Sequence, residues 1–293
     1  MDENMSSRKI YTVLFFGVFG ISTGAIFARL AVAPPLVIAA YRVGLAGLIL
    51  LPFALVKARD EMASLSRKDW LLAVVSGAFL ALHFYTWISS LELTSVAASV
   101  VLVNTIPIWA AMVSPFLGER VMPLTIAGIA LSFLGALVIG WGDLSSGLGA
   151  LWGDVLATFG AISLTGYLFA GRILRKKLSL LAYVTICYGS AGVLLWIAVL
   201  LTGISFTGFS SMTWCMFPAM AIIPQILGHS SYNWALKYLS APMVAVSLLG
   251  EPIGSSILAW VILSEIPTGL TLAGGILILA GIVMAARGEQ KGQ

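Results

Sequence analysis

The sequence predicts an all-α integral membrane protein with ten transmembrane helices, arranged as two inverted five-helix repeats around a central cavity. Three observations predict this fold: the composition, a series of long apolar runs, and a residue pattern that occurs twice. Of the 293 residues, 60% are hydrophobic and only 10% are charged. A soluble domain carries about 25% charged residues. The composition therefore excludes a soluble globular enzyme, a disordered chain and a secreted disulfide scaffold.

Ten apolar runs are each long enough to cross the membrane, which takes about 20 residues of helix. The runs are continuous, so they favour helices over the alternating strands of a membrane barrel. The first run is too long for the apolar region of a signal peptide, and Pro34 follows its end, so we interpret it as a retained helix. The predicted helices cover residues 10–31, 36–56, 70–90, 94–117, 122–141, 153–171, 180–202, 213–236, 243–264 and 268–286.

The positions of lysine and arginine predict the orientation, because cytoplasmic loops are enriched in both. With a cytoplasmic N-terminus, fourteen of the sixteen basic residues fall in cytoplasmic segments, and the outer loops contain none. The other two, Arg29 and Arg42, lie inside spans near their outer ends. We therefore expect both termini in the cytoplasm. The net charge of +4 is interpreted as a topology signal, and no nucleic-acid partner is expected.

The two halves of the chain repeat one pattern at offsets of 142 to 147 residues. Each half contains an odd number of spans, so the halves enter the membrane from opposite sides, as in many secondary transporters. Matching positions include Tyr85-Thr86-Trp87 with Tyr232-Asn233-Trp234, Pro107 with Pro252, and Glu119 with Glu265. The predicted organisation is a cytoplasmic N-terminus (1–9), a first repeat (10–141), an outer loop (142–152), a second repeat (153–286) and a cytoplasmic C-terminus (287–293).

Pro107 and Pro252 each fall near the middle of the fourth helix of their repeat. Proline removes one backbone hydrogen bond and kinks a helix. Matched interruptions in the two halves of a transporter indicate its substrate site, so we expect both kinks to line the cavity. The alternative is a packing kink, which membrane helices tolerate.

With ten spans, two repeats and a Pro…Glu…Gly…Gly ending in each half, the chain resembles the drug/metabolite transporter superfamily, EamA type, over residues 10–286. Within that group it is similar to bacterial YddG-like amino-acid exporters. The resemblance implies a bundle with a central cavity in the bacterial cytoplasmic (inner) membrane, exporting amino acids and aromatic ones in particular. It assigns structural positions, rather than ligand contacts, to Arg42, Pro107, Glu119, Pro252 and Glu265.

Polar side chains at membrane depth are costly and mark candidate functional positions. Glu251 is interpreted as coupling protons or binding an amine, or else as forming a hydrogen bond between helices. The two histidines are expected toward opposite faces of the membrane. No further ligands accompany them, so no metal or cofactor is expected. The substrate-cavity candidates are His83, Trp87, Asn104, Tyr167, Gln225, His229, Tyr232 and Glu251.

Other intramembrane residues receive structural interpretations. Arg42 is expected to fix contacts between helices or to extend toward the interface, and Arg29 to extend toward the interface. Two free thiols are expected, at Cys187 and Cys215. The small residues Gly128, Ser132, Ala136 and Gly140 on the fifth helix predict close approach of another helix, within the chain in preference to a second protomer.

The leading hypothesis is a secondary transporter that exports small neutral solutes, most of all amino acids, by alternating access. A multidrug or other metabolite exporter of the same superfamily is the alternative. A nucleotide-sugar substrate is disfavoured because only two arginines lie within the membrane, both toward the outer side. A channel or a membrane-embedded enzyme is disfavoured by the lack of a charge ring, a filter-like loop or a catalytic motif. The expected partners are a small-molecule substrate and membrane lipid; a monomer is expected and a dimer left open.

Overall fold

The computed structural model describes residues 7–113, 122–144, 147–239, 241–248 and 250–292, and that part of the chain contains helices and their connections but no strand. Eight of these helices are long and apolar enough to cross a membrane, and two shorter apolar helices follow them. The ten segments correspond in order to the ten predicted spans. The prediction of an all-helical membrane fold is confirmed.

The first repeat contains five spans, of which the first and the fourth are interrupted. Pro35 begins the second span, where its fixed φ and missing N–H suit the first helical turn. Ser66 caps the third span by accepting a hydrogen bond from the Asp69 amide at 3.1 Å. The elements are α1 (Ser7–Ser22), α2 (Gly24–Leu30), α3 (Pro35–Lys57), the short α4 (Arg59–Ala63), α5 (Arg67–Leu91), α6 (Val96–Val103), α7 (Ile106–Val113) and α8 (Pro123–Leu144).

The second repeat also contains five spans, of which the third and the fourth are irregular. The third includes Pro218 and Pro224, and it shifts to π-helical hydrogen bonding after the first of them. Proline has no N–H to donate, so a change of helix register accommodates it. The elements are α9 (Leu148–Arg175), α10 (Leu180–Thr202), α11 (Ser211–Met220), the π-helix (Ala221–His229), α12 (Ser230–Ala235), α13 (Ala241–Ser247), α14 (Gly250–Leu263) and α15 (Gly269–Gly292).

The predicted boundaries differ from the observed ones mainly around the sixth span. Helix α9 extends the predicted 153–171 at both ends and α8 continues to Leu144, so most of the expected outer loop 142–152 is helical. Hydropathy excluded these turns because they carry charged or interfacial residues, yet their backbone continues the helix. Residues 114–117 of the predicted fourth span and the candidate Glu119 lie outside the described residues.

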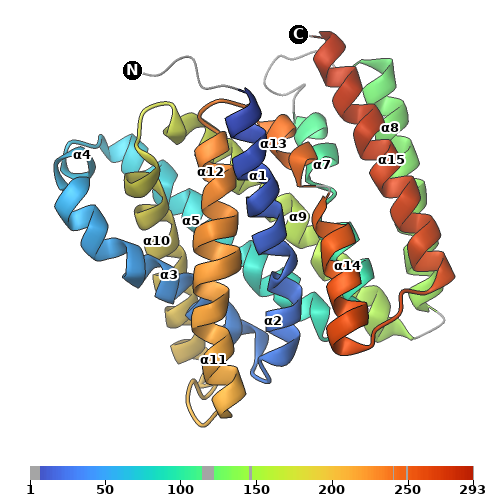
Figure 1. Ribbon diagram of the computed structural model, residues 1–293, viewed down its shortest axis with the longest axis horizontal. Helices are drawn as coiled ribbons and strands as arrows, with labels where there is room; N and C mark the ends of the chain where they lie inside the picture. Colours follow the sequence, from blue (N-terminus) through green and yellow to red (C-terminus); the bar gives the residue numbers. More distant parts are fainter. Residues whose placement is uncertain (1–6, 114–121, 145–146, 240, 249, 293) are drawn as a thin grey trace.

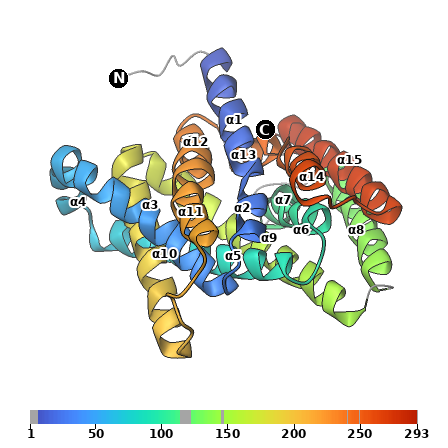
Figure 2. The same ribbon diagram turned by 60° about the horizontal axis from the view of Figure 1, so that its bottom comes forward.

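The packing of the helices follows an approximate twofold symmetry between the repeats. The second span of each repeat packs against its counterpart (α3 with α10), and so does the fifth (α8 with α15). The third span of the first repeat packs on the first span of the second (α5 on α9), and the reverse pair, α1 with the π-helix and α12, makes the equivalent contact. Figures 1 and 2 show α8 and α15 side by side at one edge, with α3 and α10 toward the other.

Helices α8 and α15 approach closely because glycines face each other along the pair. A Cβ built on Gly281 would lie 2.5 Å from the carbonyl oxygen of Gly128, and one on Gly274 would lie 2.6 Å from that of Gly135. Ser132 Oγ donates to the Ile278 carbonyl at 3.2 Å. The small residues of the fifth helix therefore accept a helix of the same chain, as predicted.

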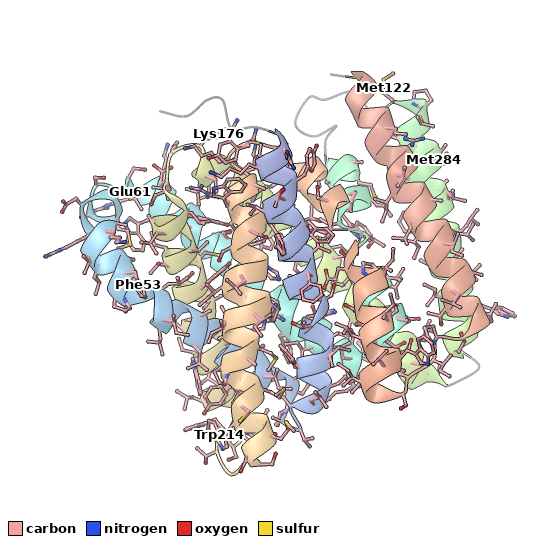
Figure 3. All side chains as sticks on the ribbon, in the orientation of Figure 1. Phe53, Glu61, Met122, Lys176, Trp214 and Met284 are labelled. Atoms are coloured by element: carbon pink, nitrogen blue, oxygen red, sulfur yellow. The ribbon has the colours of Figure 1, made fainter. Side chains whose placement is uncertain are left out.

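Helix α1 begins and α15 ends at the same end of the bundle, and α4 lies toward that end on the opposite side from α15 (Figure 1). We call this the terminal end, and the opposite one the distal end. Figure 3 shows Lys176 and Glu61 at the terminal end and Trp214 at the distal end. The chain crosses the bundle an even number of times, so its first and last helices begin and finish at the same end.

Candidate functional site

A small polar cavity lies where the interrupted helices of the two repeats meet. Its volume is about 20 Å³, room for roughly one water molecule. Six different spans contribute to it, three from each repeat. The lining residues are Arg42 from α3, His83 and Trp87 from α5, Val103 and Asn104 at the end of α6, Leu164 from α9, His229 and Tyr232 from the eighth span, and Leu248 and Glu251 from the ninth.

The two helix breaks place polar groups directly at this cavity. The fourth span stops at Val103 and resumes at Ile106, immediately before Pro107. The ninth stops at Ser247 and resumes at Gly250, two residues before Pro252. Both predicted kinks are therefore full interruptions of the helix. Asn104 ends α6 and Glu251 lies in the first turn of α14, so each break presents a polar side chain.

Asn104 and Glu251 connect the breaks to each other. Asn104 Nδ2 donates to Glu251 Oε2 at 3.2 Å and to the Val100 carbonyl at 2.9 Å. Asn104 is buried, whereas Glu251 is half-buried and lines the cavity. A carboxylate has about four acceptor sites, so Glu251 retains acceptor capacity beyond this single amide.

Arg42 lies in the same cavity, although the sequence predicted a structural or interfacial residue there. Its side chain is fully buried, with the guanidinium carbon 4.1 Å from the centre of the Phe84 ring and 5.6 Å from that of Trp87. Its Nε donates to Gln225 Oε1 at 3.0 Å. The neighbouring residue is Gly24, whose Cβ position lies 3.2 Å from Arg42 Nη1, so only glycine fits there without displacement.

The two histidines, expected toward opposite faces, lie side by side with their ring centres 6.2 Å apart. Both are close to the bundle centre, so side chains from opposite repeats reach the same space. His83 Nδ1 is 3.0 Å from the Gly160 carbonyl. A carbonyl only accepts, so Nδ1 carries the proton and Nε2 is an acceptor in the neutral ring. The His83 ring also stacks parallel to Trp87 at 6.0 Å.

Two sequence candidates lie next to the cavity rather than lining it. Gln225 is buried behind Arg42 and holds its guanidinium. Tyr167 accepts a hydrogen bond from Asn233 Nδ2 at 2.5 Å, and its ring centre is 6.4 Å from that of His229. The structure thus gathers all eight cavity candidates in one region of the bundle.

A hydrogen-bonded cluster adjoins the cavity toward the terminal end. It joins α5, α9, α10 and the eighth span, and includes the buried tyrosines 167, 183 and 188. Tyr188 is 3.2 Å from both Asn233 Nδ2 and Ser230 Oγ, and Tyr183 is 2.8 Å from Ser76. Tyr183 and Tyr188 were not among the residues predicted from sequence, because an apolar helix shows little contrast between its faces.

Two arginines assigned to a cytoplasmic loop by sequence lie within α9 instead. Arg175 is buried, and its Nε donates to the Asn233 carbonyl at 2.8 Å. Arg172 Nη1 donates to the Leu236 carbonyl at 2.5 Å. Both arginines thus bind carbonyls at the end of the eighth span, where a helix leaves its last carbonyls without internal partners. Asp154 is a further buried charge missed from the sequence.

At the distal end, an ion pair connects the two repeats. Arg29 Nη2 lies 3.5 Å from Glu265 Oε2 and 3.0 Å from the Thr94 carbonyl, and Glu265 Oε1 accepts from the Val96 amide at 2.5 Å. Arg29 also borders an open cavity of about 800 Å³ that includes Glu92. Partial burial raises the pKa of the Glu92 carboxyl, and nearby Arg29 opposes that shift.

Several buried polar atoms around the central cavity have no hydrogen-bond partner among the described residues. Such atoms are uncommon in folded proteins and call for an explanation. They are Arg42 Nη1, Trp87 Nε1, Gln225 Nε2, His229 Nδ1 and Tyr232 OH.

Comparisons with known proteins agree with this architecture. The model of the EamA-like transporter family matches residues 8–141 and again residues 151–287, so it matches each half separately. An uncharacterized transporter of Bacillus subtilis, YdfC, is 25% identical over 274 residues, covering 92% of this chain and 87% of its own. An uncharacterized transporter of Archaeoglobus fulgidus is 24% identical over 273 residues, covering 90% and 92%. A solved crystal structure has the same fold, with a TM-score of 0.69, 20% identity and coverage of 98% of this chain and 99% of its own.

Proposed function

Because the chain belongs to the EamA-like transporter family and is a multi-pass membrane transporter, we propose that it exports small neutral amino acids, aromatic ones included, across the cytoplasmic membrane of a bacterium. The observation that carries this proposal is the polar cavity at the junction of the two helix breaks. It contains one guanidinium, one carboxyl group and two histidines among aromatic rings. Such a set suits a solute with both charges and an apolar side chain.

The proposed mechanism is alternating access around this cavity. Small-molecule pockets have volumes of about 300–1,000 Å³, whereas the cavity here holds roughly one water. The repeats must therefore separate for a substrate to enter. Two sets of contacts have to open in turn. They are the hydrogen-bonded cluster of Tyr188 at the terminal end and the Arg29–Glu265 ion pair at the distal end.

We place both termini in the cytoplasm, because the basic residues gather at the terminal end. Lys57, Arg59, Lys176 and Lys177 flank α4 and α9 there. We propose a monomeric transport unit, because six spans of the same chain contribute to the cavity.

Counterflow into proteoliposomes tests the proposal. Vesicles are loaded with excess phenylalanine, threonine, uridine or a cationic dye, and uptake of the same labelled compound is followed. We expect accelerated uptake of labelled phenylalanine and threonine. Absence of counterflow for every amino acid would refute the proposal, and counterflow of the dye alone would indicate a multidrug exporter. Single-channel conductance would indicate a channel instead.

A further inference from the structure

The structure points to a specific way of holding the substrate, and this inference rests on the proposed function. We infer that Arg42, positioned by Gln225, binds the carboxylate of a zwitterion, while Glu251, with Asn104, binds its ammonium group. Arg42 is then a specificity-determining residue rather than a structural one.

The unpartnered atoms near Arg42 carry the first half of this inference. Arg42 Nη1, Gln225 Nε2 and Trp87 Nε1 are all donors, and all three are buried without an acceptor among the described residues. Unmet donors are costly when buried, and more so when they are charged. Arg42 and Trp87 line the same cavity, with the guanidinium carbon 5.6 Å from the Trp87 ring centre. A carboxylate has two oxygens and about four acceptor sites, so one anionic group there can accept from both Arg42 Nη1 and Trp87 Nε1.

The position of Arg42 is set before any ligand arrives. Phe84 lies against the face of its guanidinium, and the Gln225 carbonyl oxygen accepts from its Nε. These contacts use one nitrogen and one face of the group. They leave Nη1 without an acceptor among the described residues, and a fixed fork of donors suits a planar carboxylate.

The second half of the inference, the binding of the ammonium group, is based on Glu251. It lines the same cavity as Arg42, yet no ion pair within 4.0 Å joins the two among the described residues. The only side-chain donor found on Glu251 there is the Asn104 amide. Two opposite charges that share a cavity but do not pair can each accept one end of a zwitterion.

Charge balance then predicts selectivity. A zwitterion neutralises both groups and adds no net charge to the membrane interior. A simple amine leaves Arg42 unpaired, and a simple acid leaves Glu251 unpaired, and an unpaired buried charge is strongly destabilising. The site should therefore reject analogues that lack either charge, even when their aromatic part is unchanged.

The test compares three probes with the same ring: phenylalanine, phenethylamine, which lacks the carboxylate, and 3-phenylpropionate, which lacks the amine. Binding to the purified full-length protein in detergent is measured by calorimetry, and counterflow is measured separately. The wild type should bind phenylalanine at least tenfold more tightly than either analogue. Arg42→Gln should lose this preference over phenethylamine, and Glu251→Gln should lose it over 3-phenylpropionate.

Arg42→Lys guards against a folding defect, since it keeps the positive charge. It should bind phenylalanine more weakly than wild type but keep the preference over phenethylamine. Arg59→Gln, at the exposed start of α4, serves as the matched control and should preserve the order of the three probes. The inference would be overturned if Arg42→Gln and Glu251→Gln each bound all three probes more weakly by the same factor. It would also be overturned if the wild type bound phenethylamine or 3-phenylpropionate as tightly as phenylalanine.

The two proposals fail in different ways. Counterflow of phenylalanine by wild type, combined with unchanged selectivity in both variants, would leave the export proposal standing and reject the assigned roles. Selective binding without counterflow of any amino acid would keep the roles and reject export.

Discussion

Asn104 donates a hydrogen bond to Glu251 at 3.2 Å, and this contact joins the interrupted fourth helix of one repeat to that of the other. In an inverted-repeat transporter, movement of one repeat against the other acts on such a junction. The contact therefore links the geometry of the breaks to the proposed transport cycle.

Removing this contact should weaken the junction. We expect Asn104→Ala to lower the free energy of unfolding by about 1–3 kcal/mol, because the half-buried carboxylate of Glu251 loses its amide donor. It should also weaken phenylalanine binding. Thermal unfolding and calorimetry in detergent measure the two effects. Thr105→Ala is the matched control, since among the described residues its side chain bonds to Leu102 and Trp109 of the same span. Equal loss of phenylalanine affinity in both variants would contradict a special role for the junction.

Glu251 should make substrate binding depend on pH. As pH falls, its carboxylate gains a proton and no longer pairs with an ammonium group, so phenylalanine affinity should decrease. Glu251→Gln should bind weakly with a flat pH profile. Glu265→Gln, which alters the distal pair instead, should retain the wild-type profile. If Glu251→Gln keeps the wild-type pH dependence, another group is responsible.

The α8–α15 contact should not tolerate a larger residue. A Cβ at Gly281 would meet the Gly128 carbonyl at 2.5 Å, and overpacking of this kind costs about 1–3 kcal/mol. We expect Gly281→Ala to lower the midpoint of thermal unfolding. Gly269→Ala, on the same helix with nothing within 4 Å of its Cβ position, should not. Similar midpoints for the two variants would argue against this close approach.

The orientation can be read from two exposed positions at opposite ends. Thr207 lies in the α10–α11 connection at the distal end, and Ser64 follows α4 at the terminal end. A membrane-impermeant maleimide should label Thr207→Cys in intact cells, whereas Ser64→Cys should need permeabilised cells. The native thiols require a Cys215→Ser background, because Cys187 is buried but Cys215 is exposed. The reverse pattern would invert the proposed topology.

Much of the fold could be predicted because its signals lie along the chain. These signals can be identified without knowing which helices are neighbours. They are the lengths of the apolar segments, the basic loops and the matched prolines Pro107 and Pro252. The breaks themselves follow from proline chemistry, and the structure places them where the pattern indicated.

The arrangement within the site was harder to predict. Arg42 lies near the outer end of its span by sequence, and only packing shows that Phe84 and Gln225 hold it at the cavity. Arg175 looked like a loop residue because it is charged, yet the carbonyls of another helix bury it. Both errors have the same cause. The spacing of residues in the sequence shows which side chains share a face of a helix, but it does not show which other helix packs against that face.

Filling the cavity with a larger side chain shows whether substrate passes through it. Leu164 lines it, whereas Leu137 on α8 is 69% exposed at the outer surface of the bundle. Counterflow of labelled phenylalanine is measured for wild type, Leu164→Trp and Leu137→Trp, each checked for a monodisperse, folded preparation. We expect counterflow by wild type and Leu137→Trp, and its loss in Leu164→Trp. Unchanged counterflow in folded Leu164→Trp would show that the substrate takes another path.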